Sequence, residues 1–173
     1  MARSVLFHDV LTPRLSLTVC LVRLAACAVL LAAVSGLGAA ATYPAIPTWY
    51  AGLAKPPWTP PNFAFPIVWT ALYALMAIAL WRLWDRAPDS PVRRRALLLF
   101  LVQLALNAGW SPVFFGLHAV GAAFAIILVL IGVVAATLHA ALRADEVAGW
   151  LLVPYLPWLC YAAALNGAIL FLN

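Results

Sequence analysis

The chain has 173 residues, of which 67% are hydrophobic and 9% are charged, and its formal net charge is +5. A water-exposed surface normally carries about 25% charged residues, so this composition excludes a soluble globular protein and indicates an integral membrane protein. The basic residues are spread along the chain, with one run at Arg93, Arg94 and Arg95. This pattern favours a role in membrane topology over nucleic-acid binding, and we expect no nucleic-acid partner.

Five apolar stretches are long enough to cross a bilayer, which takes roughly 20 residues per helix. They lie at about 24–41, 65–83, 96–115, 120–142 and 148–172, and none carries a charge at mid-span. The sequence therefore predicts an all-α membrane protein, a five-transmembrane-helix bundle. We assign residues 23–173 to this membrane domain and residues 1–22 to an N-terminal extension.

The first stretch has two interpretations. Basic residues precede it, and Ala39, Ala40 and Ala41 close it in the manner of a signal-peptide cleavage site. The stretch is long for a signal-peptide core, so we favour a retained helix.

The connection at residues 42–64 is the one long loop between spans, and it is rich in proline. Proline lowers the entropy lost on ordering a segment, so this loop is expected to hold a fixed shape. We call it the lid loop.

Basic residues gather on one predicted side of the membrane. That side carries Arg3, Arg14, Arg23, Arg82, Arg86, Arg93, Arg94, Arg95 and Arg143, whereas the lid-loop side carries Lys55. By the positive-inside rule, the N-terminus is cytoplasmic and the C-terminus faces outward if the membrane is that of a bacterial cell, which we favour. In another membrane the asymmetry relates the two sides without naming the compartments.

Three spans carry aromatic and polar residues on one helical face. These residues are Trp69, Tyr73 and Met76 in the second span, Gln103, Asn107 and Trp110 in the third, and Tyr155, Trp158, Ala162, Leu165 and Asn166 in the fifth. Counting from the span ends places Trp69, Asn107, Trp110 and Asn166 in the half of the membrane beneath the lid loop, with Tyr73 and Trp158 near the middle. Such an uncharged pocket of indoles, a phenol and amides suits a flat, largely apolar ligand.

Other roles compete for some of these residues. Tryptophan is enriched at membrane interfaces, and this role suits Trp49, Trp58, Trp81, Trp84 and Trp150. For Gln103 and Asn107, hydrogen bonding between helices is as strong an interpretation as a place in a pocket.

Several classes of function lack their residues. The carboxylates all fall outside the spans, which argues against proton-coupled transport; they are Asp9, Asp85, Asp89, Asp145 and Glu146. The histidines His8, His118 and His139 lack the spacing that clamps a metal or haem between helices, and the three cysteines lack metal-ligand spacing, so no metal site is expected. No hydrolase or nucleotide-binding motif occurs.

Small residues indicate self-association into a homodimer. Ala105 and Gly109 lie four residues apart, nearly opposite the polar face of the third span. The polar face could then line a pocket while the face of Ala105 and Gly109 meets a second subunit. Rival surfaces with the same spacing are Gly36 with Ala40, Gly121 with Ala125, and Gly132 with Ala136.

The aromatic and proline motifs of the chain resemble those of the TspO/MBR family, the tryptophan-rich sensory proteins whose animal members are the translocator protein or peripheral-type benzodiazepine receptor. The matching residues are Trp49, Tyr50, Leu53, the run from Lys55 to Pro61, Phe65, Trp69, Tyr73, Met76, Gln103, Asn107, Trp110, Phe114, Phe115, Pro154, Tyr155, Trp158, Ala162, Leu165 and Asn166. The resemblance covers Leu24 to Asn166, and motifs spread over three spans and one loop make a chance match improbable.

The resemblance implies a bundle, commonly dimeric, that binds porphyrins and other tetrapyrroles, isoquinoline or benzodiazepine-type ligands and, in some members, sterols. The family pocket corresponds here to Trp69, Tyr73, Asn107, Trp110, Trp158 and Ala162. Adding neighbouring candidates, the expected ligand-binding residues are Trp49, Trp58, Trp69, Tyr73, Gln103, Asn107, Trp110, Phe114, Trp158, Ala162 and Asn166. No cofactor is expected to be obligatory, and porphyrin or haem is expected as the ligand.

The leading hypothesis is therefore a membrane-embedded tetrapyrrole receptor or sensor, with porphyrin transport or stress regulation as associated roles. An enzyme-like alternative is light-driven porphyrin degradation, which the resemblance would assign to Trp69 and Trp158. A third alternative is a structural membrane partner protein without a small ligand. The chain departs from the animal proteins in one respect, because neither a tyrosine nor a basic residue follows Leu165, and their sterol-recognition pattern needs both.

Overall fold

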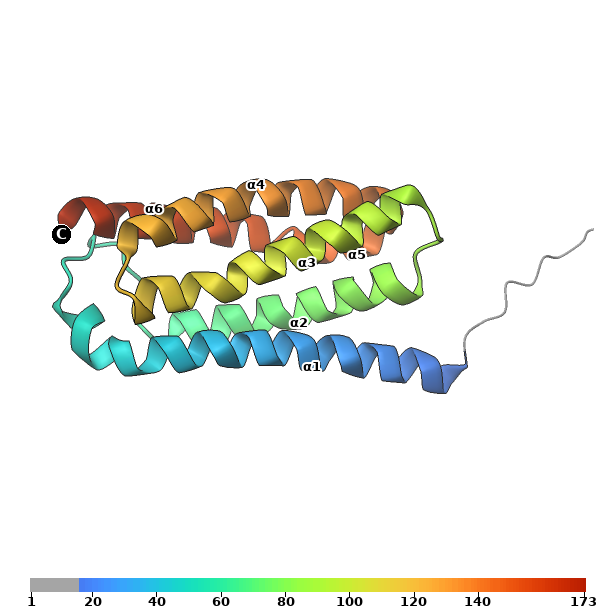
Figure 1. The fold of residues 1–173 in the computed structure, drawn as a ribbon, viewed down its shortest axis with the longest axis horizontal. Helices are drawn as coiled ribbons and strands as arrows, with labels where there is room; N and C mark the ends of the chain where they lie inside the picture. The colour runs from blue at the N-terminus through green and yellow to red at the C-terminus, as the bar shows by residue number, and fades with distance from the viewer. Residues whose placement is uncertain (1–15) are drawn as a thin grey trace, which may run out of the picture.

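The computed structural model describes residues 16–173, and it confirms the expected five-helix membrane bundle. Five long apolar helical segments run side by side along the length of the molecule (Figure 1). They are Leu17–Tyr50, Ala64–Asp85, Pro91–Gly116, Val120–Ala144 and Glu146–Leu172. Residues 1–15 of the expected N-terminal extension lie outside the described residues. This range includes Arg3, His8, Asp9 and Arg14.

Helix α1 (Leu17–Thr42) begins ahead of the expected span because Ser16 caps it, accepting a hydrogen bond from the Val19 backbone N–H. The helical path also extends beyond its predicted end. It continues through a 3₁₀ turn (Tyr43–Ala45) and a π turn (Ile46–Tyr50), each with a proline near its start. Proline removes one backbone donor, and the change of helical pitch accommodates that loss without ending the helix. The expectation that residues 42–64 are all loop is therefore wrong, since irregular structure begins only at Leu53.

Helices α2 (Ala64–Asp85) and α3 (Pro91–Ser111) form a tight antiparallel hairpin. The Arg93 guanidinium donates hydrogen bonds to the carbonyls of Leu83 (2.8 Å) and Trp84 (2.7 Å), which the end of α2 leaves without helical partners. The third helix thus begins earlier than the expected start at about residue 96, because the arginine run forms part of the first turns of α3.

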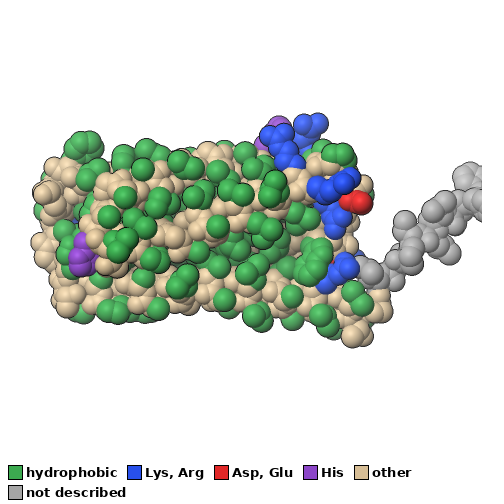
Figure 2. Space-filling view, in the orientation of Figure 1, with side chains coloured by type: hydrophobic (Ala, Val, Ile, Leu, Met, Phe, Trp, Pro, Cys, Tyr) green, Lys and Arg blue, Asp and Glu red, His purple; other side chains and the backbone are tan. Residues whose placement is uncertain are grey.

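Basic side chains gather at the end of the bundle where α2 connects to α3 (Figure 2). Hydrophobic side chains cover the length of the bundle. Ion pairs tie the helices together at this end. Arg23 in α1 pairs with Asp85 at 3.2 Å, and Arg82 in α2 makes a two-pronged contact with Asp145 at 2.9 Å for each hydrogen bond. Because Asp145 lies between α4 (Val120–Ala144) and α5 (Glu146–Leu152), these ion pairs join α2 both to α1 and to the α4–α5 junction.

At the opposite end, α3 continues into a π turn (Pro112–Gly116) that leads to α4 (Val120–Ala144). Between this turn and α4, His118 adopts the left-handed conformation with φ 55°.

The fifth span is divided into α5 (Glu146–Leu152) and α6 (Tyr155–Leu172). Pro154 lies at the junction, where its missing N–H interrupts the helical hydrogen bonds. Helix α2 packs closely on α5, whereas its backbone stays farther from α6.

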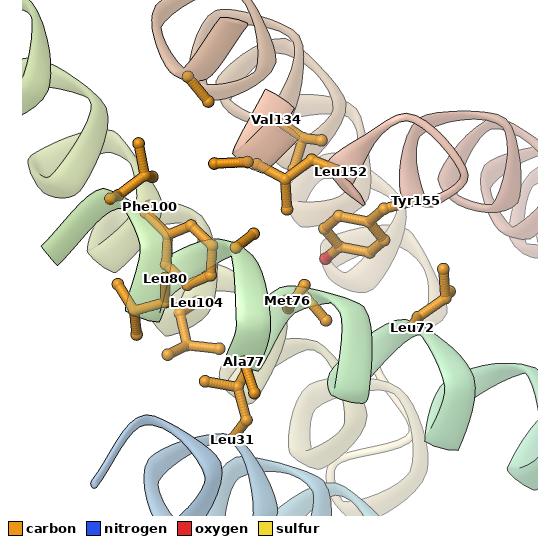
Figure 3. Packing of buried hydrophobic residues seen from close by; sticks show 14 of the residues in the cluster. Leu31, Leu72, Met76, Ala77, Leu80, Phe100, Leu104, Val134, Leu152 and Tyr155 are labelled. Atoms are coloured by element: carbon orange, nitrogen blue, oxygen red, sulfur yellow. The ribbon is translucent and has the colours of Figure 1, made fainter. Parts of the chain in front are cut away.

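The core fills the charged half of the bundle with close-packed side chains. Phe100, Leu104 and Met76 are buried between α2 and α3, and Tyr155 projects from α6 toward them (Figure 3). The half nearer the lid loop is packed less completely, and the cavity lies there.

A candidate ligand cavity beneath the lid loop

A cavity of about 230 Å³ lies inside the bundle at the lid-loop end. All five spans contribute to its lining. Eight of the residues predicted to bind ligand line it, namely Trp69, Tyr73, Asn107, Trp110, Phe114, Trp158, Ala162 and Asn166. The structure thus brings together residues that the sequence separates by almost 100 positions.

One wall of the cavity is aromatic and comes from α2 and α6. The rings of Trp69 and Trp158 meet edge to face, with centroids 6.4 Å apart and an interplanar angle of 88°. Trp69 also lies 5.5 Å from Tyr73, and Phe65 lies 6.0 Å from Trp158. These side chains present ring faces and edges on which a flat apolar molecule can stack.

The facing wall comes from α3 and the π turn that follows it. Trp110 and Phe114 stack there, with centroids 5.0 Å apart and planes 18° from parallel. The Trp110 indole N–H donates to Asn166 Oδ1 at 3.3 Å, and the Asn166 amide donates to the Val120 carbonyl at 3.1 Å. The hydrogen bonds hold the ring of Trp110 in one orientation against α6.

The floor of the cavity, on the side away from the lid loop, is polar. The Tyr73 hydroxyl donates to Asn107 Oδ1 at 2.6 Å, and the Asn107 amide donates to the Tyr155 hydroxyl at 2.7 Å. Tyr155 is fully buried behind this floor. Tyr73 and Asn107 both line the cavity, so their remaining hydrogen-bonding capacity can orient a ligand.

Three predicted binding residues lie away from the cavity. Trp49 stacks on His118 with centroids 4.2 Å apart, and Trp58 is 47% exposed and packs on Tyr161. Gln103 is buried deeper in the bundle, with its amide nitrogen 4.0 Å from Met76 Sδ and no partner for its carbonyl oxygen among the described residues. Their expected contact with a ligand has no geometric support. For Gln103 the reason is that helical spacing gives the face of a helix but not which turn reaches the cavity, and for Trp49 and Trp58 it is that the path of the lid segment cannot be read from sequence.

The lining also contains residues that the sequence analysis did not select. The largest such group comes from the first span, where Ser35, Ala39, Thr42 and Ile46 lie on one helical face. Their spacing of four, three and four residues is a helical signal that was available. These four side chains are small or aliphatic, which concealed it.

The lining is electrically neutral, since no charged residue of the described chain contributes to it. Charge is confined to the two ends of the bundle. There, burial raises the pKa of Asp145, but hydrogen bonds from Arg82 and from the Ala148 backbone N–H lower it by more, so the net shift is downward. The cavity can therefore stack and orient a ligand, but it offers no ion pair to a phosphate or a carboxylate.

The sequence of the chain also matches known proteins. The model of the TspO/MBR family matches residues 4–172. The chain is 42% identical over 125 residues to a tryptophan-rich sensory protein of Cereibacter sphaeroides, covering 72% of this chain and 77% of that protein. It is 38% identical over 150 residues to the tryptophan-rich protein TspO of Chlorobaculum tepidum, covering 87% and 95%. It is also 39% identical over 119 residues to the translocator protein of Homo sapiens, covering 68% and 70%.

Proposed function

Because the chain belongs to the TspO/MBR family, we propose that its cavity binds a tetrapyrrole such as a porphyrin or haem and that the protein acts as a membrane-embedded receptor or sensor. The observation that carries this proposal is the neutral aromatic cavity with a polar floor. Its two aromatic walls suit the faces of a flat conjugated ring, and the Tyr73 and Asn107 groups suit the few polar atoms that such a ring carries.

The size of the cavity adds a requirement. Pockets for drug-sized ligands usually measure roughly 300–1,000 Å³, and this one is smaller. A tetrapyrrole therefore needs some lining side chains to move as it binds. The wall of Trp69 and Trp158 is the part that can move, because it is held by ring contacts. Trp110 in the other wall and the polar floor are fixed by hydrogen bonds.

The arginine-rich end supports a proposed orientation in the membrane, and the face of Ala105 and Gly109 supports a proposed dimer. In a bacterial cell membrane the arginine-rich end would face the cytoplasm and the cavity would lie in the outer half. Ala105 is exposed on α3, and the Cα of Gly109 has open space beside it, so this face can meet a second subunit closely in a homodimer. Sensing, stress regulation and porphyrin transport are all compatible with such a dimer.

The direct test is a titration of the purified protein with protoporphyrin, followed by tryptophan fluorescence. We expect saturable quenching, because indoles form both walls, and weaker binding in Trp158→Ala than in the parent. Quenching that rises linearly without saturation would support a structural protein without a small ligand and would contradict the proposal.

A second candidate function is light-driven degradation of the bound porphyrin. It is favoured by the meeting of the Trp69 and Trp158 rings in the cavity wall, where excited porphyrin and dioxygen could react with an oxidisable indole. Illumination should then bleach bound porphyrin faster than free porphyrin, and it should do so less in Trp69→Phe. Equal bleaching rates for bound and free porphyrin would eliminate this function.

A further inference from the structure

A second hollow, a groove, lies on the outside of the bundle, between α2 and the α5–α6 segment. Its lining is almost wholly apolar and includes Ile67, Val68, Ala71 and Leu75 from α2, with Pro157 and Trp158 from α6. Ile67 is 64% exposed, so the groove opens to the surroundings of the bundle. Along a membrane span those surroundings are lipid hydrocarbon.

Trp158 separates this groove from the inner cavity. Within the described chain it is the one residue that lines both spaces. The ring therefore has the cavity on one side and the lipid-facing groove on the other. Between α2 and α6 the partition is built from side chains, because the two backbones do not approach as closely as those of α2 and α5.

Little holds the Trp158 ring in place. Its aromatic contacts are with the rings of Phe65, Trp69 and Tyr161, at centroid distances between 5.7 and 6.4 Å, and it also packs against the hydrophobic core. Its indole N–H is buried and has no hydrogen-bond partner among the described residues. Rotation of this ring therefore breaks no hydrogen bond.

The lid-loop end is fastened more firmly. The Asn173 side chain accepts a hydrogen bond from the Ala54 N–H at 3.0 Å and donates one to the Ala54 carbonyl at 3.1 Å. The Lys55 ammonium donates to the carbonyls of Tyr50 and Leu53, and the Tyr161 hydroxyl donates to the Trp58 carbonyl at 2.9 Å. The Lys55 bonds stiffen the lid loop itself, whereas the Asn173 and Tyr161 bonds join it to the C-terminal end of the bundle and must break if the loop is to lift.

We propose that ligand enters and leaves the cavity sideways from the bilayer, through the groove between α2 and α6, with the Trp158 ring as the gate. The inference rests on the proposed function, since it supplies the route to that cavity. It identifies the ligand in transit as a flat apolar molecule dissolved among lipid acyl chains, which reaches the protein without crossing the lid loop.

The test measures binding kinetics in nanodiscs by stopped-flow quenching of tryptophan with protoporphyrin. Ala71→Phe fills the groove from a position outside the cavity, without adding an indole. We expect its association and dissociation rate constants to fall together by about tenfold, with the equilibrium Kd unchanged, because a blocked route raises the barrier in both directions. The matched control is Ala135→Phe, an exposed position on α4, for which both rate constants should equal those of the parent.

A third variant, Asn173→Ala, removes the bonds to Ala54 and so loosens the lid loop. If the side route is used, its rate constants stay at the parent values. Parent-like rates in Ala71→Phe, or faster exchange in Asn173→Ala, would overturn the side route while leaving ligand binding intact. Loss of saturable binding in the parent itself would instead contradict the proposed function, and the route with it.

Discussion

The Asn107 amide donates to the buried Tyr155 hydroxyl at 2.7 Å, which joins the third span to the fifth at the cavity floor. Asn107 accepts from Tyr73 in the same place, so one side chain links three helices. A buried hydroxyl that loses its partner costs about 1–3 kcal/mol, and the bond therefore ties the two helices together. In the proposed function the same polar groups orient the ligand.

Replacing Asn107 with Leu should weaken both functions of the floor. We expect the apparent Tm to fall, because the Tyr73 and Tyr155 hydroxyls lose their partner in an apolar interior. We also expect the Kd for protoporphyrin to rise about tenfold, equivalent to about 1.4 kcal/mol. Thermal unfolding in detergent and fluorescence titration would measure the two effects. An unchanged Kd would mean that the floor does not contact the ligand.

Gln103→Met provides the contrast one helical turn deeper. Gln103 lies outside the cavity lining, and its carbonyl oxygen lacks a partner among the described residues. An apolar side chain of similar size removes that unsatisfied group, so the apparent Tm should stay the same or rise. The Kd for protoporphyrin should match that of the parent. A Kd higher than that of the parent would indicate that Gln103 contacts the ligand after all.

Asp145 should make the stability of the charged end depend on pH. Burial raises the pKa of its carboxyl, but the hydrogen bonds from Arg82 and Ala148 lower the pKa by more, so the pKa in the folded protein lies below its ordinary value. A lowered folded-state pKa contributes stability above the ordinary value of 3.8, and this is lost as the pH falls through the folded value.

Asp145→Asn keeps the side-chain cap of α5 but removes the charge. At neutral pH its apparent Tm should lie about 2 °C below that of the parent. The gap should narrow as the pH falls below 3.8 and close once the pH has passed the lower folded-state pKa, because the parent carboxyl is protonated only then. Tm measurements on both proteins across the acid range give the comparison. A gap that persists at low pH would show that the ion pair with Arg82 is not its cause.

Gly149 should be essential to the close approach of α5 and α4. A Cβ added there would lie 2.8 Å from the Cα of Leu142, a distance that backbone atoms cannot relieve without moving the helices. Gly149→Ala should lower the apparent Tm, in line with the roughly 1–3 kcal/mol cost of overpacking. Gly132→Ala is the control, because no described atom lies within 4 Å of a Cβ added at that position. Equal Tm values for the two variants would mean that the α4–α5 contact relaxes freely.

Much of the fold could be predicted because its dominant signals are local. A long apolar stretch identifies each span. The arginines occur near those ends of the spans that were predicted to share one side of the membrane, and the structure brings them together at the charged end. The helix ends were harder. The first helix passes Pro44 and Pro47 by changing pitch, although the sequence predicted a loop there. The stretch 148–172 was predicted as one span, but it is divided into α5 and α6 at Pro154.

The candidate site was predictable where residues carry a distinctive side chain. Trp69, Asn107 and Trp158 stand out as polar or aromatic groups at helical spacing, and they do meet in the cavity. The contribution of Ser35 and Thr42 could not be inferred from side-chain chemistry, since small residues in a span usually serve packing. The groove behind Trp158 depends on the separation of α2 and α6, which follows from tertiary packing and has no counterpart in a local pattern.

The central claim is that the cavity beneath the lid loop holds the ligand, and Ala162→Phe tests it most directly. Ala162 lines the cavity, and a benzyl group there would occupy the space without touching the charged end or the lid-loop bonds. Fluorescence titration of the folded variant with protoporphyrin should show no saturable quenching, whereas Ala135→Phe on the outer face of α4 should bind as the parent does. Parent-like affinity in Ala162→Phe would contradict the account and place the ligand elsewhere.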